Sequence, residues 1–552
     1  MSKRIIPTII FTVVLFLAAC ATLPAAPTPV PPLPAPTQAI SPTVSAIIPP
    51  TPSPFIPPAS NPLTVTLLHT NDMHGYLEGE KLTGGDGTTF EFGGIANAMG
   101  TVALLKQQAG ANTLILDAGD FWQGTFASNR NEGRAIIDAM NLVGYDALTL
   151  GNHDFDHGQD VLKTRAAQAQ FPFIAANIVE QATGKPPTWV KPYIIKEVAG
   201  LRFGVIGLAN SGTPVISKPS NSQGLKFVRE VDAVRQVLPE VKNKSDLIVV
   251  LAHEGLDYDQ RLAAEVPGID VIVSGHTHVE QRQPKVVGGT IIVHAGYKAQ
   301  YVGRLVLQID PASKRIVDYT RNGEPVAAVS NKAIPPKQVA DEMATLIANA
   351  RDAINRPIGE TQTDLLRQYT GDGRTTAEYP LGNLVVDAML AANQAGDRPA
   401  DLAMYNQGIR ADLLKGTITY GKLYETIPFD NVMTAMDLKG EDLKAILEIA
   451  TSCPRVNTLV AGISFVYDCN KPQGNRVSNI RIKGQPWDAQ KVYRVQTIDY
   501  LAGGGDGQTP FKNGTHLTYG DPMIDVVVDY VAKHSPLDLH AEGRITAAGQ
   551  GQ

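Results

Sequence analysis

The chain has 552 residues, with 48 Lys and Arg against 54 Asp and Glu and a net charge of −6. At about 100–200 residues per domain, this length predicts two or three domains, each large enough to bury its own core. The mildly acidic balance argues against a nucleic-acid polymer as a partner, because such polymers usually bind a basic face.

The first 20 residues predict an export signal and a lipid anchor. Lys3 and Arg4 precede an almost unbroken apolar run, Ile5 to Ala19, which has the length of a signal-peptide core and is short for a membrane span. Cys20 follows the small residues that end this run, a pattern that resembles a bacterial lipobox. Cys20 is therefore the predicted lipidation site, with a plain secretory signal as the alternative. We expect an exported protein anchored to the cell membrane, facing the periplasm or the cell exterior.

Residues 21–63 predict an extended, disordered tether. They are rich in Pro, Ala, Thr and Ser. Because Pro fixes φ and removes a backbone donor, the stretch cannot pack as helix or sheet. We expect a stiff spacer that holds the folded part away from the membrane.

Residues 64–333 predict a layered α/β domain. Short apolar runs alternate there with helical patterns, and Gly, Asn, Asp or His bounds each run. Runs of this kind indicate buried strands, and ligands of such sheets gather where strands end. The predicted strands are Val65–Leu68, Thr113–Leu116, Ala147–Leu150, Arg202–Ile206, Leu247–Leu251, Val271–Val273 and Thr290–Val293.

Side chains that bind metals follow five of these runs. A lone His after a strand is more often a hydrogen-bonded core or surface residue than a ligand. The joint order Asp-x-His, Gly-Asp, Gly-Asn-His-Asp, a single His and Gly-His-x-His is not expected by chance. Mixed carboxylate, amide and imidazole ligands suit Zn²⁺, Mn²⁺ or Fe²⁺ rather than a thiolate-rich structural zinc site. The five segments are His69–Gly75, Asp117–Asp120, Gly151–Asp156, Ala252–Gly255 and Gly275–His278.

This chemistry predicts hydrolysis of a phosphate ester. Two cations about 3.5–4 Å apart lower the pKa of a bridging water and clamp the phosphoryl group. A shared carboxylate must lie between them, and Asp120 is the best candidate.

The set resembles the calcineurin-type metallophosphoesterases, and the His-Thr-Asn-Asp-x-His-Gly opening is typical of their 5′-nucleotidase branch, which includes UDP-sugar hydrolases. The resemblance implies a four-layer αββα sandwich. It implies one divalent ion, Zn or Mn or similar, held by Asp72, His74, Asp120 and His278. It implies a second held by Asp120, Asn152, His253 and His276. Protonated His153 would face the phosphate, with Asp156 holding its imidazolium. Many members have Gln in place of His278, which bears on metal preference.

Other polar residues near these motifs are expected to support the site or to lie outside it. His69 is expected to pack beneath the first loop, and Asp117 to support the turn at Asp120. The remaining residues are expected beside the ligands or at the surface: Asp154, His157, His294, His516, His534 and His540.

Residues 334–357 predict an inter-domain helix. Apolar residues recur there with a helical period, and Pro335 and Pro336 stand near the start. A second domain, of the α+β class, is predicted at 358–545.

The second domain also resembles the 5′-nucleotidase family. Leu381–Ala388 looks like its Gly-Asn-Leu-x-x-Asp-Ala helix, and Asn406–Arg410 like its Asn…Gly-Gly-Ile-Arg segment with one Gly missing. Ile427–Asn431 matches Pro-Phe-x-Asn. Asp499–Gly507 matches Phe-x-Ala-x-Gly-Gly-Asp-Gly, with Tyr in place of the usual Phe. The implied substrate-binding residues are Arg374, Asn406, Arg410, Phe429, Asn431, Tyr500 and Asp506.

These residues suggest how a nucleotide would be held. Phe429 and Tyr500 are expected to sandwich the base, and stacking contributes roughly 1–3 kcal/mol per base. Asp506 is expected to accept from ribose hydroxyls. Arg374 and Arg410 suit phosphate oxygens, because the planar guanidinium matches oxyanions.

Two cysteines, Cys453 and Cys469, remain once Cys20 is assigned to the lipid. Outside the cytoplasm two such thiols often pair. A disulfide and two buried free thiols are both open at this stage.

The leading hypothesis is a two-metal 5′-nucleotidase acting outside the cytoplasm in nucleotide scavenging, with nucleoside di- or triphosphates and UDP-sugars as further substrates that the family allows. The alternative is a 2′,3′-cyclic nucleotide 2′-phosphodiesterase with 3′-nucleotidase activity, since Tyr500 also fits the clamp of that branch. A non-catalytic nucleotide-binding lipoprotein is disfavoured by the complete ligand set. A hydrolase of non-nucleotide phosphates or sulfur compounds is disfavoured by the aromatic pair. The oligomeric state stays open.

Overall fold

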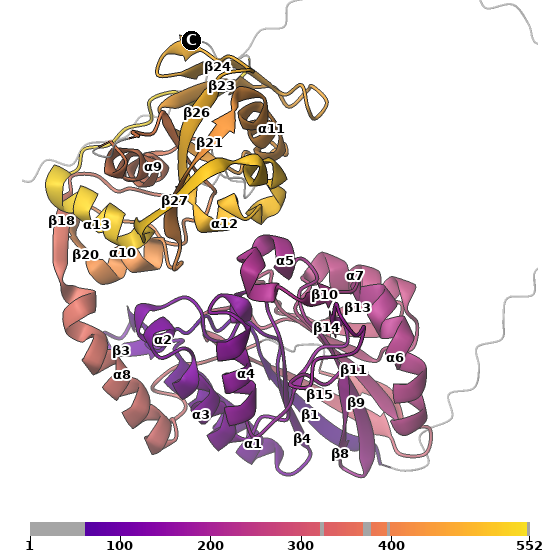
Figure 1. Ribbon diagram of the computed structural model, residues 1–552. Helices are drawn as coiled ribbons and strands as arrows, with labels where there is room; N and C mark the ends of the chain where they lie inside the picture. The colour runs from indigo at the N-terminus through magenta and orange to yellow at the C-terminus, as the bar shows by residue number, and fades with distance from the viewer. Residues whose placement is uncertain (1–60, 321–324, 368–376, 395–397, 549–552) are drawn as a thin grey trace, which may run out of the picture. The chain divides into compact units, whose positions relative to one another are not determined.

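The computed structural model describes residues 61–320, 325–367, 377–394 and 398–548 (Figure 1). The predicted signal segment with Cys20, most of the predicted tether, and Arg374 lie outside the described residues. Within the described ranges, no helix combines the length and apolarity needed to cross a bilayer. We call residues 63–355 the N-terminal lobe and residues 357–547 the C-terminal lobe.

One β-sheet of the N-terminal lobe is built around its first strand. The strand order is β16-β15-β1-β4-β5-β6, and β17 pairs with β15. β1 runs parallel to β4 and antiparallel to β15. The strands are β1 (Leu63–Thr70), β4 (Thr113–Asp117), β5 (Ala147–Thr149), β6 (Phe173–Ile174), β15 (Tyr301–Asp310), β16 (Arg315–Tyr319) and β17 (Val326–Ala327).

The second sheet of this lobe has the order β13-β14-β12-β11-β9-β8. Its four inner strands, β9, β11, β12 and β14, are parallel. The strands are β8 (Tyr193–Val198), β9 (Leu201–Leu208), β11 (Leu247–Ala252), β12 (Val271–Ser274), β13 (Lys285–Val287) and β14 (Thr290–Val293). Each of the seven predicted apolar runs therefore forms a strand, as expected.

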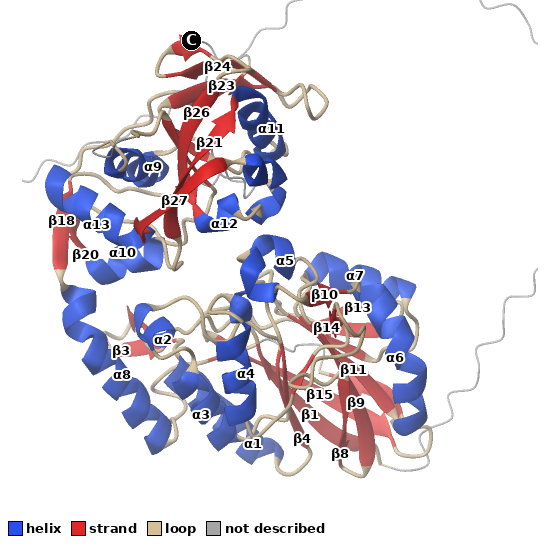
Figure 2. Cartoon of the chain, in the orientation of Figure 1, coloured by secondary structure: helices blue, strands red, loops and turns tan. Residues whose placement is uncertain are grey.

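Alternating side chains along these strands build three apolar layers. Successive side chains of a strand point to opposite faces. In β11, Val249 and Leu251 pack between the two sheets, whereas Ile248 and Val250 pack beneath helices. Helices α6 (Glu230–Lys244) and α7 (Leu256–Glu265) cover the second sheet, and α1 (Ile95–Ala109) and α3 (Arg134–Val143) cover the first (Figure 2). The predicted four-layer αββα sandwich is confirmed.

A helix was predicted at residues 334–357, and the structure has α8 (Lys337–Asn355) there, directly after Pro336. Its buried residues Val339, Met343 and Ala350 recur with the helical period. They join the apolar cluster beneath α1 and α3, so α8 packs along the N-terminal lobe before the chain enters β18 (Pro357–Thr361).

The C-terminal lobe mixes antiparallel and parallel strands with separate helices. Its largest sheet has the order β22-β19-β26-β21-β27, and a second has the order β25-β24-β23-β28. The bounds are β19 (Leu402–Tyr405), β20 (Gly416–Thr419), β21 (Val432–Lys439), β22 (Leu459–Ala461), β23 (Ile463–Tyr467), β24 (Val477–Ile482), β25 (Gln485–Pro486), β26 (Val492–Ile498), β27 (Thr515–Pro522), β28 (Ile545–Ala547), α9 (Pro380–Ala392), α10 (Tyr420–Thr426), α11 (Gly440–Ala450), α12 (Asp499–Ala502) and α13 (Met523–His534). The predicted α+β class is observed here.

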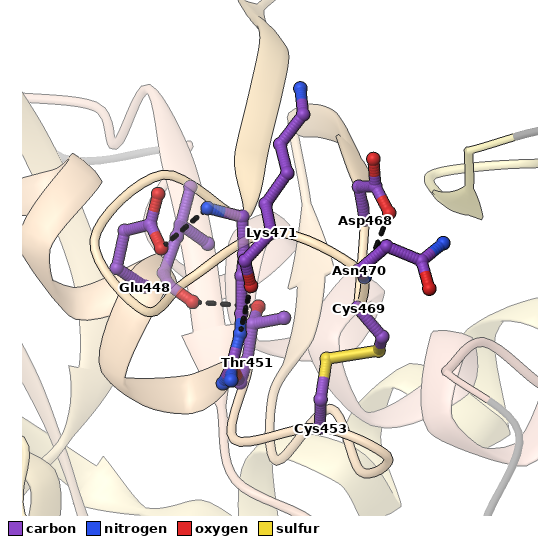
Figure 3. Close-up of a disulfide and its surroundings, with 9 residues drawn as sticks. Glu448, Thr451, Cys453, Asp468, Cys469, Asn470 and Lys471 are labelled. Atoms are coloured by element: carbon purple, nitrogen blue, oxygen red, sulfur yellow. Dashed lines mark hydrogen bonds between the residues drawn. A yellow bond between two sulfur atoms is a disulfide. The ribbon is translucent and has the colours of Figure 1, made fainter. Parts of the chain in front are cut away.

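Cys453 and Cys469 form a disulfide in this lobe (Figure 3). Their Cα atoms are 5.6 Å apart, within the usual range for a disulfide. The bond joins the loop after α11 to the turn after β23, where the Asp468 carboxylate accepts the amide of Asn470 at 2.9 Å. Of the two alternatives left open by the sequence, the structure contains the disulfide.

Removing this bond should destabilise the C-terminal lobe. The two cysteines are 16 residues apart, and a cross-link closing a loop of about 15 residues contributes about 3 kcal/mol through the entropy of the unfolded chain. We expect the double variant Cys453→Ser/Cys469→Ser to unfold at a lower guanidinium concentration than the parent. Reductant should lower the midpoint of the parent and leave that of the double variant unchanged. A reductant effect of equal size on both proteins would contradict this prediction.

Candidate active site

The predicted metal ligands all lie at strand ends of the two sheets. Carboxyl ends of parallel strands meet at one edge of a sheet, and β1, β4 and β5 are parallel in the first sheet, as are β11 and β12 in the second. The ligands follow β1 (Asp72, His74), β4 (Asp120), β5 (Asn152), β11 (His253) and β12 (His276, His278).

These side chains gather in two groups whose ligand atoms all lie within 4.8 Å of one another. One group is Asp72, His74 and His278, and the other is Asp120, His253 and His276. The family resemblance placed the same two sets at separate ions, with Asp120 at both, and metal binding by these side chains stays a prediction.

Asp120 lies between the two groups. Its Oδ2 is 3.0 Å from His253 Nε2 and 3.8 Å from His74 Nε2. Its other oxygen accepts the main-chain amide of His153 at 2.8 Å. A carboxylate with one oxygen facing both groups has the geometry required of a bridging ligand.

Asn152 completes a donor set that fits divalent cations. Its Oδ1 is buried and has no hydrogen-bond partner among the described residues, and a buried acceptor left unpaired in this way calls for a ligand. Gly151 precedes it, and a Cβ there would clash with Asp120 Oδ1, so only Gly allows this close approach. Oxygen and imidazole donors of this mixture suit Zn²⁺ or Mn²⁺.

Five of the seven predicted ligands adopt left-handed backbone conformations. Such φ values are uncommon for residues with a side chain, and they cluster at functional sites because the surrounding fold must hold them. The five are Asp72 (φ 51°), His74 (47°), Asp120 (55°), His276 (74°) and His278 (57°).

Electrostatics favour neutral imidazoles at two of the ligands. Burial lowers the pKa of His74 to about 3 and that of His276 to about 4, and the neutral ring is the form that binds metals. At His253 burial acts in the same direction, but the carboxylates of Asp120 and Asp72 outweigh it and raise the pKa to about 10. A cation at His253 would therefore have to displace a proton, so we expect metal affinity to fall as the pH falls.

Buried polar residues around the ligands hold the strand-end turns. Asp117 accepts the amide of Gly119 at 2.9 Å, as expected of a residue supporting the Asp120 turn. Asp154, expected beside the ligands or at the surface, is fully buried and accepts the amides of Asp120 at 3.0 Å and Gly151 at 2.8 Å. It thereby ties the turn after β4 to the turn after β5.

The other histidines differ in burial, and His157 is half-buried, with its Nε2 3.9 Å from Asp430 Oδ2. His69 and His294 are buried, at 2% and 1% exposure, and His294 Nε2 lies 3.9 Å from Asp72 Oδ2. The three histidines expected at the surface are exposed: His516, His534 and His540.

His153 and Asp156 form a pair beside the ligand groups. His153 Nδ1 lies 2.7 Å from Asp156 Oδ2. Burial alone lowers the pKa of His153, but the carboxylates of Asp156 and Asp120 outweigh burial and raise it. The pair therefore favours a protonated imidazole.

A cavity of about 1030 Å³ adjoins these residues. It is lined by His74, Asp120, Asn152, His153 and His278 and also by residues of the C-terminal lobe. Of the seven predicted substrate-binding residues, the six that the structure describes line it: Asn406, Arg410, Phe429, Asn431, Tyr500 and Asp506.

Phe429 lies next to the His153 side of the cavity. Its ring stacks on the His153 imidazole, with centroids 5.9 Å apart and planes at 27°. The Arg410 guanidinium lies 5.2 Å from the centroid of the Phe429 ring. An aromatic side chain and a fixed cation thus adjoin the residue predicted to face the phosphate.

Tyr500 and Asp506 are held together in the same cavity. The Tyr500 hydroxyl donates to Asp506 Oδ1 at 2.6 Å, and burial, followed by the Asp506 charge, raises the pKa of Tyr500. Asp506 Oδ2 accepts from the side-chain amides of Asn406 at 2.9 Å and Asn457 at 3.1 Å. The predicted clamp residue therefore also orients the predicted ribose acceptor.

Several lining residues were not anticipated from the sequence. Tyr297 stacks on His278 with centroids 5.0 Å apart and planes at 8°, and Lys298 lies over the Tyr297 ring. Both follow β14, so inspection of that strand end would have found them. Gln123, which donates to the Pro428 carbonyl at 2.9 Å, and Asn457 carry no such local signal.

Comparison with known proteins gives the same division of the chain. The family described as calcineurin-like phosphoesterase matches residues 65–280. The family described as 5′-nucleotidase, C-terminal domain, matches residues 357–513. Each match falls within one lobe.

Alignments with similar proteins cover most of this chain and most of each relative. An apyrase of Tabanus yao is 30% identical over 530 residues, which cover 87% of this chain and 93% of that protein. A 5′-nucleotidase of Mus musculus is 30% identical over 540 residues, covering 87% and 90%. The solved structure of a 5′-nucleotidase precursor from Thermus thermophilus is 30% identical, with a TM-score of 0.78 and coverage of 89% and 100%. The chain therefore belongs to the 5′-nucleotidase family of calcineurin-like metallophosphoesterases and is a metal-dependent phosphoric monoester hydrolase.

Proposed function

We propose that this protein hydrolyses nucleoside 5′-monophosphates to nucleosides and inorganic phosphate with two divalent cations. One observation carries the proposal: Asp120 faces both ligand groups, and the cavity beside them is lined by the candidate nucleoside-binding residues. A site that binds a phosphoryl group at one end and a nucleobase at the other fits a nucleotide.

The proposed ligands divide as the two groups do. Asp72, His74 and His278 would hold one cation, and Asn152, His253 and His276 the other, with Asp120 shared. When bound, such cations activate water as a nucleophile and neutralise charge on the phosphoryl oxygens. The oxygen and imidazole donors support Zn²⁺ or Mn²⁺.

The protein's own residues would act on the phosphoryl group from the other side. The His153 imidazolium, held through Nδ1 by Asp156, would donate through Nε2 to a phosphoryl oxygen and stabilise charge that grows in the transition state. Arg410 would pair with a phosphate oxygen through its planar guanidinium. In the reaction the ester P–O bond breaks, water supplies the new P–O bond, and the nucleoside leaves with a proton on its 5′ oxygen.

Nucleoside recognition is assigned to the C-terminal lobe. Phe429 and Tyr500 would stack on the base, and Asp506 would accept from ribose hydroxyls. Asn406 and Asn431 would complete the contacts with the nucleoside. Stacking tolerates different bases, which supports a broad rather than base-specific nucleotidase.

The proposed location is outside the cytoplasm, with a scavenging role. The basic, apolar and Cys20 pattern at the N-terminus supports export and lipidation there. Removing a phosphate also removes the charge that is costly to carry across a membrane. Hydrolysis at the cell surface would therefore make nucleosides available for uptake.

A 2′,3′-cyclic nucleotide phosphodiesterase is the second candidate, favoured by Tyr500 in place of the usual Phe.

The main proposal is tested with purified protein starting near Leu63 and supplied with Mn²⁺ or Zn²⁺. We expect it to release phosphate from AMP and UMP and to lose this activity in EDTA. ATP, UDP-glucose, 3′-AMP and 2′,3′-cyclic AMP would complete the panel, with a coupled phosphatase for substrates that yield no free phosphate.

The outcomes separate the candidates. Turnover of only the cyclic and 3′ substrates would replace the main proposal with the second one. Binding of AMP without turnover of any substrate would indicate a nucleotide-binding lipoprotein and overturn both.

A further inference from the structure

A segment outside the metal-ligand motifs flanks the turn that carries His153. This flanking segment, residues 213–222, contains the short helices α5 (Thr213–Ile216) and η2 (Pro219–Ser222). It follows the end of β9, whose loop carries none of the predicted ligands. Ser217 and Asn221 contact the His153 turn, whereas Lys218 and the Val215 carbonyl oxygen, which accepts from the Tyr500 hydroxyl at 3.0 Å, contact the C-terminal lobe.

Two side chains of the segment bind the main chain of the turn. The Ser217 hydroxyl, in a residue only 3% exposed, donates to the Asn152 carbonyl oxygen at 2.7 Å. Ser217 Oγ also lies 3.4 Å from Asp156 Oδ1. The Asn221 side-chain amide donates to the Asp156 carbonyl oxygen at 2.8 Å. These contacts fall on the residues immediately before and three residues after His153.

The turn is short, and its first half is held by Asp154, which accepts the Gly151 amide at 2.8 Å, and by Asp120, which accepts the His153 amide at 2.8 Å. It is a single 3₁₀ turn, η1 (His153–Phe155), without a side-chain cap, and such turns have poorer hydrogen-bond geometry than α-helices. The direction of the His153 ring depends on Asp156, which accepts from Nδ1 at 2.7 Å. The direction of the unpaired Asn152 Oδ1 depends on the same backbone. Contacts from the flanking segment therefore influence the position of both the His153 ring and Asn152 Oδ1.

We propose that Ser217 is a positioning residue for phosphoryl transfer. Its hydroxyl has one hydrogen to donate, and the short bond to Asn152 uses it. That bond fixes the backbone from which Asn152 and His153 are presented. The proposal rests on the proposed function, because it concerns the same turnover.

The expected effect is on the rate rather than on binding. A misplacement of 1 Å can lower the rate about 10²-fold, and losing one hydroxyl should shift the turn by less than this distance. We therefore expect Ser217→Ala to lower kcat about 10-fold, with KM little changed. Ser217→Thr keeps a donor hydroxyl and should recover most of kcat.

A loss of activity in Ser217→Ala could instead arise from an effect on the C-terminal lobe. Lys218 Nζ lies 2.5 Å from Asp499 Oδ2, and Asp499 Oδ1 accepts the amide of Tyr500 at 3.0 Å. A substitution at Ser217 could therefore disturb base binding instead of the His153 turn. In that case KM for AMP would rise, while turnover of p-nitrophenyl phosphate, which has no nucleobase, would stay unchanged.

The experiment compares Ser217→Ala, Ser217→Thr and the control Ser222→Ala on both substrates. Ser222 is as buried as Ser217, at 4% exposure, but its hydroxyl bonds within the segment, to the Pro219 carbonyl at 3.4 Å. We expect kcat to fall for AMP and p-nitrophenyl phosphate alike in Ser217→Ala only, with thermal melting and bound Mn²⁺ close to the parent values.

Three results would overturn the proposal: an unchanged kcat in Ser217→Ala, an equal loss in Ser222→Ala, or a loss confined to AMP. If Ser217→Ala does not fold, Asn221→Ala tests the same turn from a more exposed position and should lower kcat on both substrates. A parent that hydrolyses p-nitrophenyl phosphate but not AMP contradicts the proposed function, while the Ser217 comparison still decides this inference. A parent inactive on both overturns both.

Discussion

Asp120→Asn is expected to abolish nearly all phosphomonoester hydrolysis and most divalent-metal binding. The substitution keeps the shape of the side chain but removes the negative charge that lies between the two ligand groups. Replacing a residue that only orients a metal ligand lowers metal affinity or activity by roughly 10–100-fold. A carboxylate facing both groups should cost more, so we expect kcat/KM to fall by more than about 10²-fold.

The measurement pairs AMP turnover with the metal content of the purified protein. Asp318→Asn, which removes a carboxylate from an exposed position on β16, is the matched control and should behave like the parent. If Asp120→Asn kept the full metal content and half of the activity, the shared-ligand assignment would be wrong.

His153→Gln is expected to separate catalysis from metal binding. His153 belongs to neither ligand group, so metal content should stay at the parent level. The imidazolium charge beside the phosphoryl group is lost, and removal of one such transition-state donor typically costs about 10²–10³-fold in kcat. KM for AMP should change little, because the interaction strengthens only as charge grows in the transition state.

Two controls accompany this variant. His534→Gln removes an exposed imidazole and should leave kcat unchanged. Asp156→Asn keeps His153 but removes the carboxylate at its Nδ1, and it should lower kcat by a smaller factor. A His153→Gln protein that loses its metal along with its activity would place His153 among the ligands instead.

The sequence by itself predicted a layered α/β domain for the N-terminal lobe and the order of its candidate ligands, and the family resemblance added the four-layer arrangement. Strands such as β11 could be recognised because apolar runs bounded by polar turn residues are local patterns. The candidate ligands could be recognised because parallel strands of one sheet end at a common edge, so that side chains distant in sequence, such as Asp72 after β1 and Asp120 after β4, are expected close together. Family motifs added the candidate substrate residues of the C-terminal lobe.

Only the tertiary structure decided how these side chains meet. The burial of Asp154, the stacking of Phe429 on His153 and the bond from Ser217 to Asn152 join segments that no local pattern relates. Cys453 and Cys469 illustrate the same limit, because thiol pairing depends on the distance between two loops. Periodicity determines which face of an element is apolar, whereas a contact between two elements depends on the packing of the whole lobe.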